Sequence, residues 1–325
     1  MLVGAHVRAG ADLLGALSRG ELIGADVVQV FTASPRAWRA TRYSPAVLAA
    51  YRQAQAAHPR VQATFCHASY LVNLATDDPD LLARSRASLT ANLAIARAMG
   101  SSGVVLHVGS HKGAGLAACL PRIVDALAEA LATAVPPEPG SSSCPVLLEN
   151  AAGAGGTVGR TFEELAQILA AAPAGADLGV CLDTQHLWAS GIGFATPEEA
   201  DRLVERFDKV VGLDRLCCLH LNDSKVPFGA GRDRHENVGA GTIGEAALGA
   251  LLGHPALAGL PVILEVPGAG AGPRAEDVAA ARRVIANGAA ARARSRGAVQ
   301  GGRPPRRLHP ASATSHAGPA EKERT

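Results

Sequence analysis

Metal-binding side chains recur in this sequence at the points where short apolar runs end. Three further candidate ligands lie outside the apolar runs. His186 follows the run that ends at Asp183 by three residues, and Asp233 and His235 stand two residues apart in a later polar segment. Imidazole nitrogens and carboxylate oxygens are ligands that Zn²⁺ and Mn²⁺ accept, so the set predicts a centre of two or three ions. Six of the apolar runs finish on His67, His107, Glu149, Asp183, His220 and Glu265.

The apolar runs are expected to be the strands of a (β/α)8 TIM barrel. A longer amphipathic stretch follows each run, which is the pattern of repeated βα units. Eight units favour a closed barrel, in which all strand C-termini open on one face, so the candidate ligands should converge there. Cap signals at Ser44, Thr161 and Thr196 predict three of the helix starts. The strands are expected near residues 2–6, 26–31, 61–67, 103–107, 145–149, 178–183, 216–220 and 261–265.

Each candidate ligand also has an ordinary structural explanation. A single His or Glu at a strand end is more often a hydrogen-bonding residue than a metal ligand. The whole set is harder to explain in that way, because each unpaired charge buried at one barrel end would cost several kcal/mol. A metal cluster is therefore the better explanation.

The six cysteines form no CxxC pair, and most lie inside apolar runs. This favours reduced core thiols over disulfides or an all-cysteine zinc site. Cys66 precedes His67, but neighbours on a strand point to opposite faces, so Cys66 should not share its metal. No apolar run is long enough to span a membrane and no secretory start is evident, so we expect a cytoplasmic protein that binds no membrane.

The C-terminal residues differ in composition from the rest of the chain. Residues 291–325 hold eight Arg or Lys and two Glu, although the net charge of the whole chain is only +2. Hydrophobic periodicity disappears there, and Arg, Gly, Pro and Ser dominate. We expect one catalytic barrel domain over residues 1–290 and a disordered basic tail over 291–325.

Several motifs, in this order, resemble the endonuclease IV family of apurinic/apyrimidinic (AP) endonucleases. The resemblance extends from residue 3 to about residue 268. Departures include Ala151, Ala240 and Gln185, the last standing where many members carry Cys; none of them removes a candidate ligand. The motifs are GAH at 4–6, HASYLVNL at 67–74, HVGSH at 107–111, LEN at 148–150, CLDTQH at 181–186, HLNDSK at 220–225, DRHEN at 233–237 and LE at 264–265.

The resemblance implies three zinc ions, with Mn²⁺ as an alternative at one site. His67, His107 and Glu149 would hold the first ion, and Glu149 would bridge to a second held by Asp183, His220 and Glu265. His186, Asp233 and His235 would hold the third. Glu149 would be the catalytic residue that helps to orient or deprotonate the attacking water.

The resemblance also implies a substrate, which is damaged duplex DNA containing an abasic site. Hydrolysis on the 5′ side of that site would leave a 3′-hydroxyl and a 5′-deoxyribose phosphate, as in base excision repair. Arg36 resembles the family residue that enters the DNA stack, and Tyr70 with Leu71 occupies the place of a second wedge. We expect the protein to act as a monomer.

Two other functions fit parts of the same pattern. A metal-dependent sugar isomerase or epimerase shares the fold and the strand-end ligands, but it would leave His186, Asp233 and His235 without a task. A zinc-stabilised DNA-binding module suits the basic tail, yet it does not explain ligands arranged to leave coordination positions open. Nicking of a duplex with an abasic site would distinguish the endonuclease from both.

Overall fold

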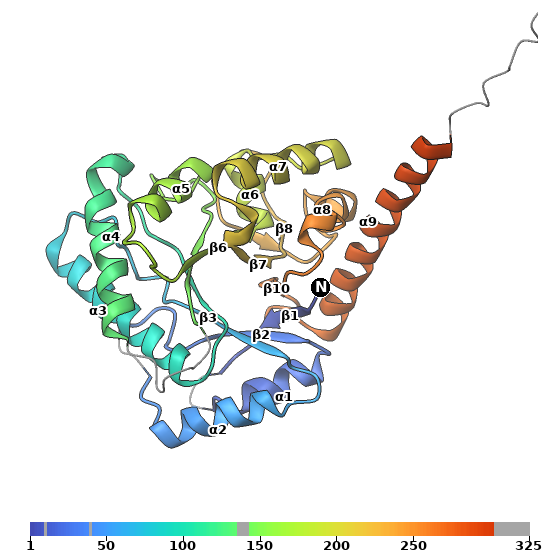
Figure 1. Cartoon of the computed structure of the whole chain (residues 1–325). Helices are drawn as coiled ribbons and strands as arrows, with labels where there is room; N and C mark the ends of the chain where they lie inside the picture. Colours follow the sequence, from blue (N-terminus) through green and yellow to red (C-terminus); the bar gives the residue numbers. More distant parts are fainter. Residues whose placement is uncertain (10–11, 39–40, 135–142, 302–325) are drawn as a thin grey trace, which may run out of the picture.

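Eight parallel strands close into a barrel in the computed structural model, which describes residues 1–9, 12–38, 41–134 and 143–301, with side chains to residue 295. The strands follow one another around the barrel in the order β1-β10-β7-β6-β5-β4-β3-β2, with the helices outside them (Figure 1). The predicted TIM barrel is thereby confirmed, and every strand lies within two residues of its expected range. The strands are β1 (Val3–His6), β2 (Val27–Phe31), β3 (Ala63–His67), β4 (Val104–Leu106), β5 (Val146–Glu149), β6 (Leu178–Asp183), β7 (Leu216–His220) and β10 (Val262–Leu264).

The helices begin where the cap signals predicted. Ser44, Thr161 and Thr196 each accept a hydrogen bond from a backbone N–H in the first turn, at 3.3 Å. A short antiparallel pair, β8 (Asp223–Ser224) and β9 (His235–Glu236), lies outside the barrel. The helices are α1 (Gly15–Leu22), α2 (Pro45–Ala56), α3 (Pro79–Ala98), α4 (Leu116–Thr133), α5 (Phe162–Ala171), α6 (Thr184–Ser190), α7 (Pro197–Val210), α8 (Gly244–Leu252) and α9 (Ala275–Gly301), with 3-10 turns at Leu213–Arg215 and Pro255–Leu257.

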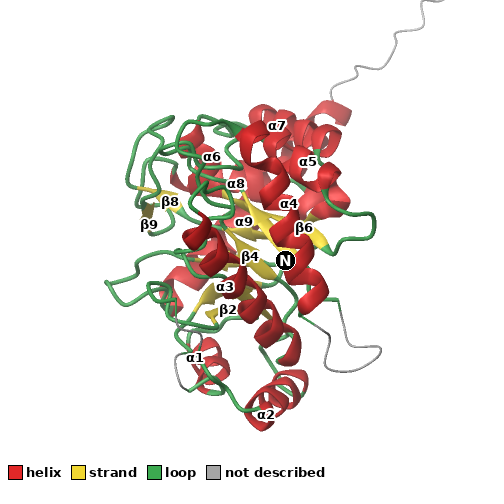
Figure 2. Ribbon diagram, turned by 90° about the vertical axis from the view of Figure 1, so that its left-hand side faces the viewer, coloured by secondary structure: helices red, strands yellow, loops and turns green. Residues whose placement is uncertain are grey.

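The barrel interior is layered because side chains on a strand alternate between its two faces. The layer further from the C-terminal ends of the strands is apolar and consists of Val27, Phe65, Val105, Leu147, Cys181, Cys218 and Ile263. Two residues further along each strand, the same inward direction is taken by a polar side chain. These residues are Gln29, His67, His107, Glu149, Asp183, His220 and Glu265. The expected ligands are therefore the continuation of the core at the C-terminal end, where long loops gather with β8 and β9 (Figure 2).

The cysteines behave as predicted. All six are free. Cys66 points away from the barrel interior and its Sγ lies 3.6 Å from Met99 Sδ. Among the residues that the structure describes, no helix has the length and apolar character needed to cross a membrane.

The domain boundary expected after residue 290 falls inside helix α9, which continues to Gly301. Arg292 is 9% exposed; its Nη1 lies 2.5 Å from Asp201 Oδ1 and its Nη2 donates to Ala250 O at 2.8 Å. Alanine and arginine are strong helix formers, so the segment can be helical without large apolar residues. The aliphatic part of an arginine side chain can also cover apolar surface, which a search for periodic apolar residues does not detect. The helix projects beyond the barrel (Figure 1). Residues 302–325 of the predicted tail lie outside the described residues.

Candidate metal centre

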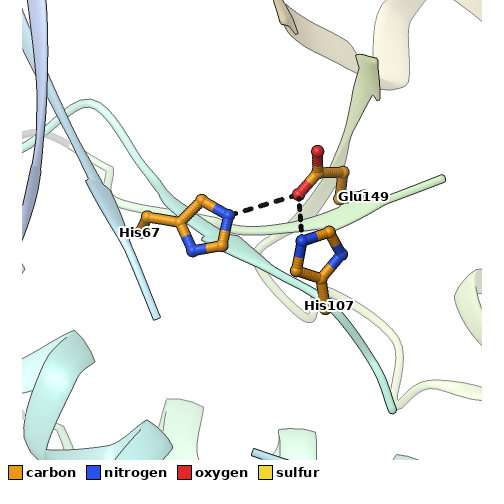
Figure 3. Close-up of side chains that lie close together, drawn as sticks. All are labelled: His67, His107 and Glu149. Atoms are coloured by element: carbon orange, nitrogen blue, oxygen red, sulfur yellow. Dashed lines mark hydrogen bonds and ion pairs between the residues drawn. The ribbon is translucent and has the colours of Figure 1, made fainter. Parts of the chain in front are cut away.

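The first group of expected ligands meets at one oxygen of Glu149. His67 ends β3, His107 directly follows β4, and Glu149 ends β5. Both histidines point their Nε2 atoms at Glu149 Oε2, at 3.3 Å each (Figure 3). The three strands are neighbours in the barrel, so residues more than 80 positions apart in the chain become a compact N, N, O set. This is the grouping expected from the sequence.

The second group uses the other oxygen of Glu149. His220 Nδ1 lies 2.9 Å from Glu149 Oε1, 3.3 Å from Glu265 Oε2 and 3.9 Å from Asp183 Oδ2. One ligand atom from each of Glu149, Asp183, His220 and Glu265 lies within 4.8 Å of the others. Glu149 thus faces both groups, as a bridging carboxylate must.

The third group joins helix α6 to the β8–β9 hairpin (residues 223–236). His186 Nε2 lies 3.3 Å from Asp233 Oδ2, and His235 Nε2 lies 3.1 Å from Asp233 Oδ1. Asp183 Oδ2 is 3.7 Å from His235 Nε2, so Asp183 stands between the second and third groups. The sequence placed Asp183 in the second group alone. All nine expected ligands are thus brought together at one end of the barrel.

The histidines are oriented by hydrogen bonds on the side away from the carboxylates. The Nδ1 atoms of His67, His186 and His235 donate to the carbonyl oxygens of Ala68 at 2.7 Å, Asn150 at 2.9 Å and Glu265 at 3.3 Å. In its neutral form each ring therefore carries its proton on Nδ1 and turns the lone pair of Nε2 inward. Such partners fix the tautomer and raise the basicity of metal-binding histidines.

Two contributors to the site were not given a role from the sequence. Gln29 Oε1 accepts from His220 Nε2 at 3.0 Å, which leaves His220 Nδ1 free to bind a cation. Gln29 Nε2 donates to Glu265 Oε1 at 2.6 Å, and His6 Nδ1 lies 3.0 Å from the same oxygen. Glu265 Oε2 is then left for the centre. The signal for Gln29 was available, because this amide stands alone in the apolar run Val27–Phe31 with the inward phase of Val27.

The pKa shifts reflect opposite charges held together in a buried site. Burial lowers the pKa of His220, but Glu265 and Glu149 outweigh it and raise that pKa to about 10. Burial likewise lowers the pKa of His235, while Asp183 and Asp233 raise it to about 9. Burial raises the pKa of Glu149, yet the histidines around it, His107 and His220 foremost, hold it well below its usual range. At neutral pH the metal-free site therefore keeps the Glu149 carboxylate ionised.

Two observations indicate that these residues are suited to bind divalent cations. His186 Nε2 and His235 Nε2 are buried without a hydrogen-bond partner among the described residues, although Asp233 oxygens lie about 3 Å away. Glu149 and Asp183 are 0% exposed, and a histidine must be neutral to bind a metal, so in the loaded site the ions would supply the positive charge that these buried side chains need. Cys181 Sγ also lies within 4.8 Å of Glu149 and His220 ligand atoms, but burial raises the pKa of its thiol well above normal. We therefore assign it to the apolar layer.

The three expected DNA-contacting residues lie on two adjacent loops beside the centre. Arg36 is exposed, Tyr70 is 52% exposed, and Leu71 is half-buried. Ser69 Oγ donates to Pro35 O at 3.1 Å, which ties the loop after β3 to the loop after β2. The Tyr70 ring packs edge-on at 5.4 Å from His67. A cavity of about 1020 Å³ opens beside these loops; its lining includes His6, Arg8, Phe31, Tyr70 and Glu265.

Comparison with known proteins places the chain in a family. Residues 19–287 match the family of xylose isomerase-like TIM barrels. A probable endonuclease 4 from Halorhodospira halophila is 39% identical over 265 residues, which cover 82% of this chain and 88% of that protein. The crystal structure of endonuclease IV from Thermus thermophilus aligns with a TM-score of 0.73 at 34% identity, covering 90% of this chain and 100% of that one. A D-tagatose 3-epimerase-like protein aligns with a TM-score of 0.64 at 17% identity over 91% of this chain and 99% of its own, a likeness of fold alone. The chain belongs to the endonuclease IV family of xylose isomerase-like TIM barrels.

Proposed function

We propose that this protein is a zinc-dependent AP endonuclease that hydrolyses the phosphodiester on the 5′ side of an abasic site in duplex DNA. The observation that carries the proposal is the convergence of nine N and O ligands, in three groups joined by Glu149 and Asp183, at one barrel end. Membership of the endonuclease IV family supports DNA as the substrate. Products would be a 3′-hydroxyl and a 5′-deoxyribose phosphate.

The ligand chemistry suits zinc at each of the three groups. His67, His107 and Glu149 would hold one ion, and Asp183, His220 and Glu265, with the second oxygen of Glu149, would hold another. His186, Asp233 and His235 would hold the third, with Mn²⁺ as an alternative ion at one site. Bound ions would make water a nucleophile at neutral pH and neutralise the charge on the phosphate.

The residues of the chain would hold and orient the reacting groups. Glu149 presents one oxygen to each of two groups, so it is suited to keep the attacking water between them and to accept its proton. Gln29 and the backbone carbonyls fix which nitrogen each histidine turns inward. Such pre-orientation lowers the barrier because the site need not reorganise during the reaction.

Damage recognition would fall to the loops after β2 and β3. Arg36 and Tyr70 are exposed side chains on two loops that the Ser69–Pro35 hydrogen bond joins, and the Tyr70 ring lies beside His67, which suits insertion into a DNA stack. Leu71 would support the Tyr70 wedge. An abasic nucleotide lacks the base pairing and stacking that oppose flipping, so it can leave the duplex at low cost. The protein would act as a monomer, and its cytoplasmic location stays a prediction.

The sugar epimerase interpretation is less well supported. Proteins of that kind resemble this chain in fold at 17% identity, whereas the endonuclease relatives are 36–39% identical over more than four fifths of the chain. The third group, with Asp233 on an exposed hairpin, also has no role in epimerisation of a small sugar.

The test is cleavage of an end-labelled duplex carrying one abasic site, with a matched intact duplex as control. We expect nicking only of the abasic duplex, a 3′-hydroxyl product that a polymerase can extend, and loss of activity after metal removal with recovery on adding Zn²⁺. A protein that carries its metals yet leaves the abasic duplex intact would refute the proposal.

A further inference from the structure

The third ligand group depends on where the β8–β9 hairpin lies. Asp233 and His235 come from this hairpin, whereas His186 comes from helix α6. The hairpin loop is exposed at Lys225, Arg232 and Arg234, and it contains two glycines with positive φ, Gly229 and Gly231. A loop of this kind loses conformational entropy when it is held in one position, so the group needs contacts that hold it.

Helix α6 supplies those contacts. Figures 1 and 2 both show α6 beside β8. Gly229 N donates to Trp188 O at 3.0 Å, and Gly231 N donates to Ala189 O at 2.8 Å. The same helix is capped at its N-terminus by Asp183, whose Oδ1 accepts from His186 N at 2.8 Å. One short helix thus presents His186 and fixes the middle of the hairpin loop.

The side chain of Gln185 reaches both ends of that loop. Gln185 is 0% exposed and lies between the two ligands Asp183 and His186. Its Nε2 donates to Arg232 O at 3.0 Å, next to Asp233, and to Ser224 Oγ at 3.3 Å, where the loop begins. Its Oε1 is buried without a hydrogen-bond partner among the described residues. A buried amide that is satisfied only on its donor side costs stability, so the donor contacts are the feature that explains its presence.

We propose that Gln185 is a positioning residue for the third metal group. Its amide holds Arg232 O, and with it Asp233 and His235, at the separation from His186 at which one divalent ion can bind all three. The inference rests on the proposed metal centre and adds a residue to it. Removing a partner that orients metal ligands typically weakens metal affinity about ten- to hundredfold. Because Gln185 contacts the hairpin and not the other two groups, the loss should fall on one ion of three.

The test compares wild type with Gln185→Met, which keeps the length but has no donor, and Gln185→Asn, which keeps the amide but is too short to reach Arg232 O. Ser190→Ala is the control, because Ser190 lies on the same helix and, among the described residues, its hydroxyl donates to Leu187 O of that helix. Bound zinc is counted after dialysis against buffered Zn²⁺. Trypsin cleavage after Arg232 and Arg234 is timed on the zinc-loaded full chain.

We expect both Gln185 variants to retain two ions, to bind the remaining one about ten- to hundredfold more weakly, and to be cut faster in the hairpin. Ser190→Ala should match wild type. A folded Gln185 variant with wild-type zinc content and cleavage rate would overturn the inference, as would an equal loss of all three ions. If Gln185→Met does not fold, Gln185→Asn decides alone. Neither readout uses DNA cleavage. If the wild-type protein holds three ions but does not cut abasic DNA, the proposed function is refuted and the inference about Gln185 still stands.

Discussion

The candidate metal centre is built from two structurally different regions, the strand ends of the barrel and the β8–β9 hairpin. Glu149, Asp183 and His220 are 0% exposed and continue the inward stripes of their strands. The Asp233 side chain is 53% exposed and belongs to a loop. Closure of the barrel fixes the backbone of the strand-end ligands, and hydrogen bonds such as those of Gln29 orient their side chains. The hairpin must be fixed by hydrogen bonds from outside the barrel strands, such as those of Gln185 on helix α6.

The largest effect is expected from the strand-end region. Glu149→Gln should reduce cleavage of an abasic duplex by about a thousandfold or more, because the bridge between two groups loses its charge and transition-state stabilisation by metals is worth several kcal/mol. Binding of abasic DNA should stay within about tenfold, since the loops that contact DNA are separate. Single-turnover cleavage and a binding titration measure the two. Cleavage at the wild-type rate would remove Glu149 from the chemistry.

The same contrast explains what the sequence predicted well. The convergence of strand-end residues such as His67 and Glu149 could be predicted because side-chain alternation and parallel closure fix where they point. Gln29 was overlooked because an amide is not one of the usual zinc ligands, although its phase along the strand matched theirs. The contact of Gln185 with Arg232 O joins residues 47 apart in the chain, and no local pattern encodes it. The sequence did not predict that helix α9 continues past residue 290. Arg292 packs there through an ion pair with Asp201, and no apolar pattern marks the segment.

A hairpin substitution should affect one ion rather than all of them. Asp233→Asn removes the carboxylate that faces both His186 and His235, so we expect about hundredfold weaker binding of one ion and retention of two. Competition for zinc with a chromophoric chelator distinguishes the weakly bound ion from the two that are retained. Asp183→Asn is the matched comparison, because Asp183 stands between two groups and should weaken two ions. If both variants lose the same ions, the division of the centre into two regions does not hold.

Protons should leave both regions when the metal-free protein takes up zinc. The folded-state pKa values of His220 and His235 are raised to about 10 and about 9, above the ordinary value of about 6.5, so both rings are protonated at pH 7 in the metal-free protein. Zinc binds the neutral ring, so affinity should rise with pH below about 9, roughly tenfold per pH unit for each proton displaced.

Calorimetry in two buffers of different ionisation enthalpy counts the protons released at pH 7. His235→Gln should lower that count by about one and leave the contribution of His220. No release of protons would mean that the histidines are already neutral, and the electrostatic account of the site would be wrong.

The smallest effect is expected from the loops that carry no ligand. Arg36→Ala and Tyr70→Ala should each slow cleavage of a duplex with an abasic site by about tenfold, because a lost wedge contact is worth about 1–3 kcal/mol and only part of that is realised in the transition state. Zinc content should stay at the wild-type level, since neither side chain is a ligand in any of the three groups. Tyr70 is the sharper probe, because its ring packs 5.4 Å from that of His67 and a Tyr70→Phe control keeps that packing. Loss of zinc from Tyr70→Ala with retention in Tyr70→Phe would show that the ring shapes the first metal group, and that the division of tasks between ligand-bearing strands and DNA-contacting loops is incomplete.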